Sequence, residues 1–235
     1  MPDAGRVIAG TARSIRLEAP GEGTRPLGDR VKQTLFAILD SDLRGAQFLD
    51  LFAGSGAAGI EALSRGAAHA TFVDRDAGAI RTIKANLQRT SLADQTTVTR
   101  GEVLAWLRDA ARAHEPPRDV VLLDPPYEDT AALAAALDAL GPLLAPTARV
   151  VAKHFWRDTP PARVGLLASD RERRFGETAL TFYRVSPSHG PSSSDGPPSW
   201  VGPSASDAPT PSEAPIASEA PTPSEASTPS GGEER

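Results

Sequence analysis

The chain has 235 residues, 40% of them hydrophobic and none of them cysteine. This composition allows one sizeable buried core and excludes a disulfide framework, a thiolate metal site and a cysteine nucleophile. No apolar run approaches the roughly 20 residues of a membrane span, and the start lacks the apolar block of a signal peptide, which predicts a cytoplasmic protein without a membrane partner. The formal charge is −5.

Two short apolar segments open the chain. Residues 6–10 and 14–17 are predicted to form strands that are joined around Gly10-Thr11-Ala12, which gives a small β-hairpin extension over residues 1–23. Next, residues 31–39 place most of their apolar side chains on one helical face, with Asp29 as the expected N-cap. Basic residues slightly outnumber acidic ones in this region, which permits contacts with phosphate.

Strand and helix signals alternate from residue 48 onward. Strands are predicted over residues 48–52, 70–74, 96–99, 120–124, 149–152 and 178–185, and helices over residues 60–64, 77–89, 103–112 and 131–144. Repeated β-α units with short connections predict an α/β fold, in which a parallel sheet is covered by helices on both faces. We expect residues 24–185 to form this domain, with the last strand closing the sheet.

The composition changes at the C-terminal end. Residues 186–235 are rich in Pro, Ser, Ala and Glu, and they hold half of the 22 prolines and most of the excess negative charge. Such a segment cannot bury enough apolar surface to offset the entropy of ordering it. The sequence therefore predicts a disordered acidic tail over residues 186–235, and the rest of the chain is close to neutral.

The loop after the first predicted sheet strand has the features of a nucleotide site. Gly54 and Gly56 begin a GxGxxG pattern, whose glycines let the backbone approach a ligand closely. Asp74 ends the second strand, where it can accept hydrogen bonds from ribose hydroxyls, and Glu102 follows the third strand, where it can receive an adenine amine. Asp50 precedes the loop and suits a cationic methionine group better than a pyrophosphate, which favours S-adenosylmethionine over a dinucleotide.

A second motif follows the fourth strand. Asp124-Pro125-Pro126-Tyr127 comes directly after four apolar strand residues, which places it at the ligand edge of the sheet. The Asp124 carboxylate and the Pro125 carbonyl can accept hydrogen bonds from an exocyclic base amine, and Tyr127 can stack on the extruded base. These four residues are the predicted catalytic group for transfer of a methyl group by in-line displacement.

The two motifs together carry a family resemblance. Asp50-Leu-Phe-Ala-Gly-Ser-Gly56 with Asp124-Pro-Pro-Tyr127 resembles the Rossmann-like class I methyltransferases that act on amino groups. Further matching segments are Arg6-Val-Ile-Ala-Gly10, Thr24 to Phe36, Glu61-Ala-Leu-Ser-Arg-Gly66 and Arg174-Phe-Gly-Glu177. With them, residues 5–185 are similar to the RsmD family, whose members methylate the N2 amine of a guanine in 16S ribosomal RNA.

This resemblance implies several properties of the chain. The expected cofactor is S-adenosylmethionine, and the expected partner is 16S rRNA or the assembling small ribosomal subunit. RNA contacts are expected from the N-terminal arginines Arg6, Arg13, Arg25 and Arg30. Because the four histidines are scattered, no metal is expected. We also expect a monomer.

One departure and several alternatives stay open at this point. Lys153-His154 stands where many relatives of the RsmD family carry a glutamate after the fifth strand, and the role of that glutamate is open. The nearest alternative activity is adenine-N6 methylation of DNA or RNA, because the same motif serves any exocyclic amine. A protein-glutamine methyltransferase, an NAD-dependent oxidoreductase and a noncatalytic RNA-binding module explain fewer of the motifs.

Overall fold

The computed structural model of the protein describes residues 3–21 and 27–186. Its main sheet consists of β3 (Gln47–Leu51), β4 (His69–Asp74), β5 (Thr96–Arg100), β6 (Arg118–Leu123), β7 (Leu144–Phe155), β8 (Arg163–Val164), β9 (Leu167–Phe175) and β10 (Thr178–Val185). Their order across the sheet is β5-β4-β3-β6-β7-β10-β9-β8. The first five of these run parallel, and β10, β9 and β8 continue the sheet in antiparallel fashion.

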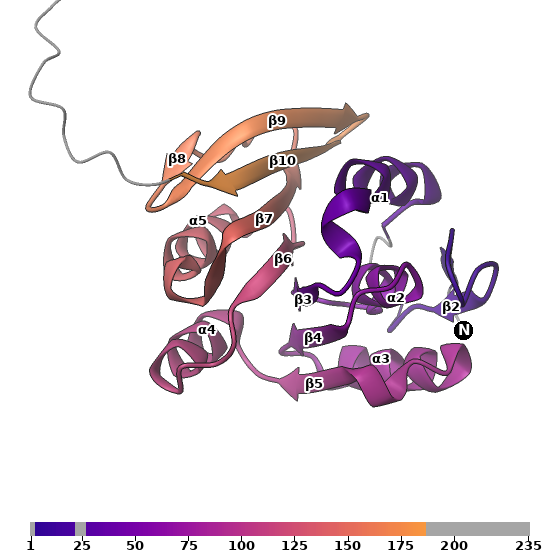
Figure 1. Ribbon diagram of the computed structural model, residues 1–235. Helices are drawn as coiled ribbons and strands as arrows, with labels where there is room; N and C mark the ends of the chain where they lie inside the picture. The colour runs from indigo at the N-terminus through magenta and orange to yellow at the C-terminus, as the bar shows by residue number, and fades with distance from the viewer. Residues whose placement is uncertain (1–2, 22–26, 187–235) are drawn as a thin grey trace, which may run out of the picture. The chain divides into compact units, whose positions relative to one another are not determined.

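Helices cover both faces of this sheet, as the alternating sequence pattern predicts. They are α1 (Asp29–Leu43), α2 (Ala57–Ser64), α3 (Ala77–Thr90), α4 (Val103–Arg112) and α5 (Thr130–Ala139). Figure 1 shows α1, α2 and α3 on one face and α4 and α5 on the other. Each face has its own buried cluster of apolar side chains, one centred on Phe36, Phe48 and Phe72 and the other on Leu107, Leu123 and Leu137. The α/β fold is confirmed.

Local chemistry explains where several of these helices begin. Asp76 precedes α3 and its carboxylate accepts a hydrogen bond from the Ala79 N–H at 2.7 Å, while Asp129 accepts one from Ala132 at the start of α5. Both aspartates are N-caps, which satisfy donors that the first helical turn leaves without partners. Asp29 is different, because it is the first residue of α1 and Gly28 occupies the cap position without a side-chain bond. The expected N-cap role of Asp29 is therefore wrong.

The order of the strands places a crevice at the centre of the sheet. The chain moves from β3 outward to β4 and β5 on one side, then returns to add β6 and β7 on the other side of β3. The carboxyl ends of β3 and β6 are therefore the topological switch point, where open α/β sheets bind their ligands. Both candidate motifs of the sequence follow these two strands.

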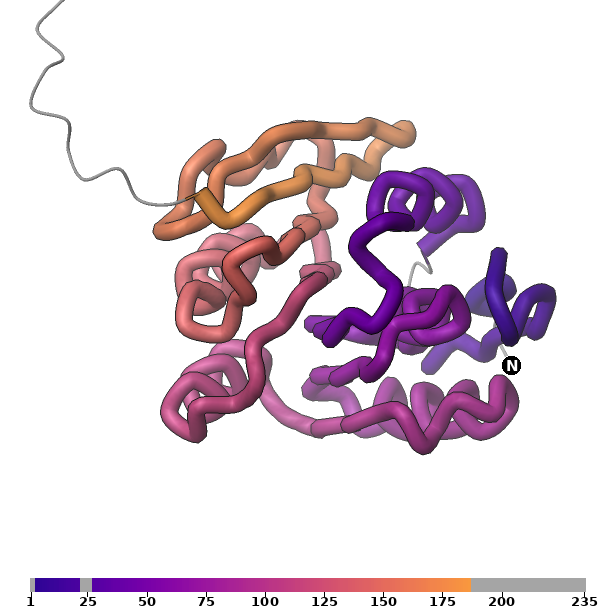
Figure 2. Tube along the Cα trace, viewed as in Figure 1, coloured from indigo at the N-terminus to yellow at the C-terminus, as the bar shows by residue number. Residues whose placement is uncertain are grey.

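The N-terminal hairpin is confirmed, although its first strand lies earlier than predicted and its second strand slightly later. β1 (Asp3–Arg6) pairs with β2 (Arg16–Glu18) in antiparallel fashion, and the connecting segment lies against α2. In Figure 2 this indigo segment passes beside α2 and α3 before the chain reaches α1. Its apolar residues Ala4, Val7 and Leu17 are buried in the same cluster as Phe36 and Phe72, so the hairpin shares the core of the sheet.

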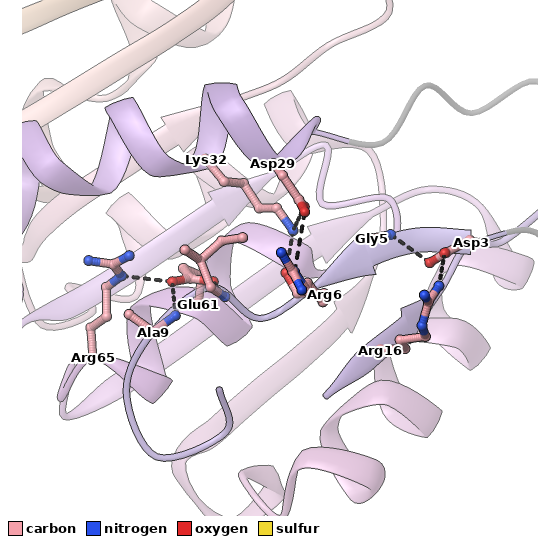
Figure 3. A network of polar contacts seen from close by, with 10 residues as sticks. Asp3, Gly5, Arg6, Ala9, Arg16, Asp29, Lys32, Glu61 and Arg65 are labelled. Atoms are coloured by element: carbon pink, nitrogen blue, oxygen red, sulfur yellow. Dashed lines mark hydrogen bonds and ion pairs between the residues drawn. The ribbon is translucent and has the colours of Figure 1, made fainter. Parts of the chain in front are cut away.

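A buried carboxylate fixes this attachment (Figure 3). Glu61 of α2 accepts the backbone N–H groups of Ile8 and Ala9 at 2.7 and 3.0 Å, and it pairs with Arg65. On α1, buried Lys32 donates to the Arg6 carbonyl at 2.6 Å. These charge-assisted bonds satisfy backbone groups that the short hairpin would otherwise leave without partners. The matching segment around Glu61 that carries part of the family resemblance is thus a docking site for the hairpin.

Two predicted boundaries are corrected at the end of the sheet. The helix expected to reach residue 144 ends at Ala139, and β7 begins at Leu144 after a short 3-10 turn. Residues 178–185 do form a strand, but they do not close the sheet, because β9 and β8 extend it further. The predicted disordered tail lies beyond the described residues except for Ser186. None of the described helices combines the length and apolar character that a membrane crossing requires.

Candidate functional site

A large cavity lies at the switch point, with a volume of about 1150 Å³. Its walls come from the glycine loop after β3, the ends of β4 and β6, the start of α4, and β7. The sequence-predicted residues that line it are Asp50, Gly54, Asp74, Glu102, Asp124, Pro125, Pro126 and Tyr127. Both predicted halves of the site, the cofactor loop and the catalytic motif, therefore face one space.

The glycine loop owes its shape to positive φ angles. Gly54 has φ +55° and Gly56 has φ +74°, a region that residues with a Cβ adopt at a cost. Gly54 lines the cavity, and its N–H donates to Asp74 at 2.8 Å. Gly56 lies behind the cavity wall, where a Cβ would come within 3.1 Å of Ile83. Its contribution is therefore to the turn that leads into α2.

Phe52 is a strained residue in the same loop that the sequence did not reveal. It has φ +59° without being glycine, and it lines the cavity. A backbone in this region costs on the order of 1–3 kcal/mol and persists where the surrounding structure imposes it, often beside a ligand. The following Ala53 N–H donates to the Val73 carbonyl at the end of β4, which ties the strained loop to the sheet.

Three acidic side chains line the cofactor half of the cavity. Asp50 is 1% exposed and accepts the Gly59 N–H at 2.9 Å. Burial, opposed by this hydrogen bond and reinforced by the charges of Asp124 and Asp74, raises the pKa of Asp50 well above its usual range. Asp74 accepts the backbone N–H groups of Gly54 and Asp76. Glu102, with a side chain 68% exposed, lies 3.9 Å from Arg75.

The predicted catalytic motif, Asp124 to Tyr127, forms the opposite wall. The Asp124 N–H donates to the Leu51 carbonyl, which anchors the motif to β3. The Pro126 carbonyl accepts a hydrogen bond from the Asp129 N–H in the turn before α5. The Pro125 carbonyl lies one residue before this hydrogen-bonded turn. The Tyr127 hydroxyl is within 2.6 Å of Thr178 Oγ1 on β10, and its ring packs against Phe155. The tyrosine ring is thus held at both its edge and its hydroxyl.

Lys153 completes this wall, and the sequence alone gives it no role. Its Nζ lies 2.5 Å from Asp124 Oδ1 and 5.1 Å from the centroid of the Tyr127 ring, and its side chain is only 8% exposed. The register explains the contact, because Leu123 of β6 is paired with Ala152 of β7 and the next residues are Asp124 and Lys153. Lysine side chains are rarely this buried without a partner, and here the partner is the carboxylate of the catalytic motif.

The described arginines among those predicted to contact RNA do not line the cavity. Arg6, Arg13 and Arg30 are exposed on the hairpin and α1, and Arg6 lies 3.5 Å from Asp29. Arg25 lies outside the described residues. None of the three described arginines lines the cavity, so a role in RNA contact would be at the flank of the site.

A second basic group lies closer to the catalytic motif. Phe155 contacts both Tyr127 and Trp156, and the guanidinium groups of Arg157 and Arg174 lie over the Trp156 ring at 4.9 and 3.5 Å. Arginine and aromatic side chains in alternation suit the stacking and phosphate contacts of single-stranded RNA. Arg174 belongs to β9, a strand that the sequence pattern did not predict, so this grouping could not be found without the fold.

Comparison with known proteins agrees with this geometry. The family model described as "Conserved hypothetical protein 95" matches residues 5–184. YlbH of Bacillus subtilis, whose name gives rRNA methylation as a provisional activity, is 38% identical over 182 residues, which cover 76% of this chain and 98% of that protein. The Ribosomal RNA small subunit methyltransferase D of Haemophilus influenzae is 42% identical over 52% of this chain, and the match spans 63% of that protein, less than two thirds of it.

A solved structure shows the same arrangement. The Escherichia coli protein yhhF, provisionally named a methyltransferase, superposes with a TM-score of 0.66 at 30% identity, covering 77% of this chain and 97% of that chain. The residues that the family model matches, 5–184, span most of the hairpin and the main sheet. The chain belongs to the family described as conserved hypothetical protein 95, within which its relatives carry the names of ribosomal RNA methyltransferases.

Proposed function

We propose that the protein transfers a methyl group from S-adenosylmethionine to the N2 amine of a guanine in 16S ribosomal RNA. The observation that carries this proposal is the meeting of two motifs in one cavity: the glycine loop with Asp50 and Asp74 on one wall, and Asp124 to Tyr127 on the other. Residues 24–185 would be the catalytic domain and residues 1–23 its extension. The methyltransferase names of the relatives support the reaction class.

The residues of the cofactor wall fit S-adenosylmethionine. Asp50 and Asp74 are carboxylates that form no ion pair with a described side chain, and Asp50 is held in a buried site. A ligand that brings positive charge relieves the unfavourable burial of the Asp50 charge. Asp74 keeps lone pairs for ribose hydroxyls beyond its two backbone contacts. Gly54 lets the backbone approach, and Glu102 lines the cavity at the start of α4, where it is proposed to receive the adenine amine.

The acceptor wall is suited to a base amine. When bound, the cofactor supplies an electrophilic methyl group on a sulfonium centre. The sulfur of this centre is the leaving group and becomes a neutral thioether. An exocyclic amine is a weak nucleophile because its lone pair is delocalised into the ring. Asp124 and the Pro125 carbonyl accept one hydrogen bond each from this amine, which draws the nitrogen toward a tetrahedral geometry with its lone pair toward the methyl carbon. Tyr127 stacks on the base, and Pro126 fixes the turn.

The methyl transfer forms one bond to the methyl carbon and breaks another. The nitrogen lone pair forms the new bond to carbon, the carbon–sulfur bond breaks, and its electron pair stays on sulfur. The nitrogen then releases one proton, and Asp124, which holds that hydrogen, is the acceptor in contact with it. The chain needs no metal for this reaction, and the catalytic contribution is mainly alignment and hydrogen bonding.

The partner follows from the relatives and from the flank of the cavity. We propose 16S rRNA or the assembling small ribosomal subunit, with Arg6, Arg13, Arg25 and Arg30 as flanking contacts and Arg157 with Arg174 nearer the catalytic motif. Such a substrate would place the protein in the cytoplasm, acting as a monomer. The chief competing activity is adenine-N6 methylation, which the same carboxylate and carbonyl would serve.

The test is methyl transfer from labelled S-adenosylmethionine to three acceptors, followed by nucleoside analysis. The acceptors are small ribosomal subunits from cells lacking the protein, naked 16S RNA, and unmethylated DNA. We expect label as N2-methylguanosine in at least one RNA sample, and the better substrate identifies the assembly state that is recognised. If the label were found as N6-methyladenine and none as methylated guanine, the proposed target base would be wrong, but the protein would still be a methyltransferase that acts on an exocyclic amine.

A further inference from the structure

The side chain of Asn86 joins two segments that are far apart in the sequence. It lies on α3, is fully buried, and its amide oxygen accepts a hydrogen bond from the Glu18 N–H at 2.9 Å. Its amide nitrogen donates to the Glu18 carbonyl at 2.9 Å and to the Ser55 carbonyl at 3.0 Å. Glu18 ends β2 of the N-terminal hairpin, and Ser55 lies in the glycine loop. One amide group therefore ties the hairpin to the loop.

These contacts require an amide at this position. Both N–H groups of Asn86 are used as donors, and its oxygen is used as an acceptor. An ionised aspartate would offer no donor, and an apolar side chain would remove all three bonds. Because buried backbone groups that lose their partners destabilise their surroundings, the position of Asn86 on α3 sets where both segments lie.

The chain enters the wall of the cavity directly after this junction. Residues 19–21 line the cavity, as do Gly54 and Ser55 of the glycine loop. The Pro20 carbonyl lies 3.7 Å from the position that a Cβ on Gly78 would occupy, near the start of α3. The exit of the hairpin therefore contributes to the wall on the side of the cavity that is proposed to hold the cofactor.

We propose that residues 19–21 are part of the cofactor site and that Asn86 is the positioning residue that holds them against the glycine loop. This inference rests on the proposed function and deepens it, because it makes the hairpin a component of cofactor binding as well as a flank for RNA. A cofactor that contacts both the loop and residues 19–21 stabilises the docked hairpin. By the same linkage, a docked hairpin tightens the binding of the cofactor.

A second set of bonds holds the hairpin without reaching the glycine loop. The Oγ of Ser64, the last residue of α2, accepts the Ala12 N–H at 2.9 Å and donates to the Ala9 carbonyl at 2.6 Å. Ser64 is buried, and neither this residue nor the hairpin segment 8–12 lines the cavity. Ser64 and Asn86 thus both hold hairpin backbone, but of the two only Asn86 contacts the glycine loop. Ser64 therefore provides a matched control.

The experiment compares Asn86→Leu with Ser64→Ala in the full-length protein. In Asn86→Leu, the Kd and the KM for S-adenosylmethionine should rise roughly tenfold, because the cofactor wall loses its anchor, while kcat at saturating cofactor stays within about twofold. In Ser64→Ala, the Kd for the cofactor should stay within about twofold of the wild-type value. Thermal unfolding reports whether each variant is folded.

Hydrogen exchange in the wild-type protein tests the same junction without a variant. The Glu18 N–H is bonded to Asn86 and the Ala12 N–H to Ser64, so NMR of these two amides reports on the two anchors separately. With the cofactor at about 100 times its Kd, openings that release it are suppressed roughly 100-fold. Exchange of the Glu18 N–H should therefore slow at least roughly tenfold, and exchange of the Ala12 N–H should slow less.

The outcomes separate this inference from the function on which it rests. Wild-type cofactor affinity in folded Asn86→Leu would overturn the role of Asn86, and so would an equal loss in Ser64→Ala, which would indicate general loosening of the hairpin. If Asn86→Leu does not fold, exchange in the wild type decides, and equal slowing at both amides or none at Glu18 would overturn the inference. Absence of S-adenosylmethionine binding by the wild-type protein would instead overturn the proposed function.

Discussion

The two walls of the cavity hold carboxylates in opposite electrostatic settings. On the cofactor wall, Asp50 and Asp74 are held by backbone N–H groups, and neither forms an ion pair with a described side chain. On the acceptor wall, Asp124 is neutralised by Lys153 at 2.5 Å. One wall therefore holds carboxyl groups without a cationic partner, and on the other wall the carboxylate is paired with an ammonium.

This difference corresponds to the two molecules that the cavity is proposed to hold. A cationic cofactor is favoured by uncompensated carboxylates in a site with little water, where charge interactions are stronger than in bulk solvent. A neutral base is favoured by a wall whose charges already cancel and whose directional hydrogen bonds remain. Asp50, Asp74 and Asp124 lie at neighbouring strand ends but need not have the same role, because the groups that each carboxylate contacts determine what it can bind.

The largest expected effect comes from removing the balanced pair. In Asp124→Ala with Lys153→Met, methyl transfer should fall roughly 10²-fold or more, because the amine loses a directional acceptor in the transition state. The dissociation constant for S-adenosylmethionine should stay within about threefold by calorimetry. The double variant avoids leaving the Lys153 ammonium buried and unpaired, which would cost several kcal/mol. A parallel loss of cofactor binding would contradict the separation of the two walls.

A smaller effect is expected from the tyrosine ring. Tyr127→Ala should reduce kcat/KM for RNA by roughly tenfold, since stacking of a base on an aromatic side chain contributes about 1–3 kcal/mol. Tyr127→Phe keeps the ring and loses only the contact with Thr178 Oγ1, so it should retain activity close to that of the wild type. If Tyr127→Ala were fully active in the same assay, stacking would have no part in the reaction.

The two groups of arginines allow the RNA-facing side to be mapped. Replacing Arg157 and Arg174 with alanine should weaken RNA binding severalfold and lower its dependence on salt, because phosphate contacts release counterions. The matched control replaces Arg13 and Arg30, which are exposed on the hairpin and α1, and should have the smaller effect. The measurement is RNA affinity over a range of salt concentrations. A larger loss in the control would place the RNA on the hairpin side.

The smallest expected effect concerns stability. Because burial raises the pKa of Asp50 in the folded state, its charged form destabilises the fold at any pH above the unfolded pKa of about 3.9. This destabilisation is absent below that pH and grows as the pH rises toward the raised pKa. Asp50→Asn should therefore increase Tm at neutral pH. Thermal unfolding should show that the difference in Tm between Asp50→Asn and the wild type vanishes near pH 4. An unchanged or lower Tm of the variant at neutral pH would contradict the raised pKa of Asp50.

The central sheet could be predicted from the sequence because its strands are continuous apolar runs. Residues 48–52 and 120–124 lie in the middle of a parallel sheet, where both faces are covered, and their pattern is unmistakable. β9 escaped prediction for the opposite reason: Leu167–Phe175 carries three arginines and two acidic residues, and most of its side chains are exposed. Such charged strands are typical near sheet edges, where they discourage pairing with other chains.

The candidate site, like the sheet, could be predicted only in part. Asp50, Asp74 and Asp124 were identified because strand ends and glycine spacing are visible in the sequence. The partner of Asp124 was not identified, because Lys153 lies 29 residues away and is brought close only by the pairing of β7 with β6. Contacts across neighbouring strands depend on register, which requires the order of the strands in the sheet.

The central claim, that the carboxyl groups of the cofactor wall lack a cationic partner while Asp124 is paired with Lys153, is tested most directly by counting protons. Calorimetry of S-adenosylmethionine binding in two buffers of different ionisation enthalpy, from about pH 5 to pH 8, gives the number of protons released. A cation that binds beside Asp50 lowers its pKa, so we expect proton release in the wild type and in Asp124→Ala with Lys153→Met, and a smaller release in Asp50→Asn. The same release in Asp50→Asn as in the wild type would contradict the account.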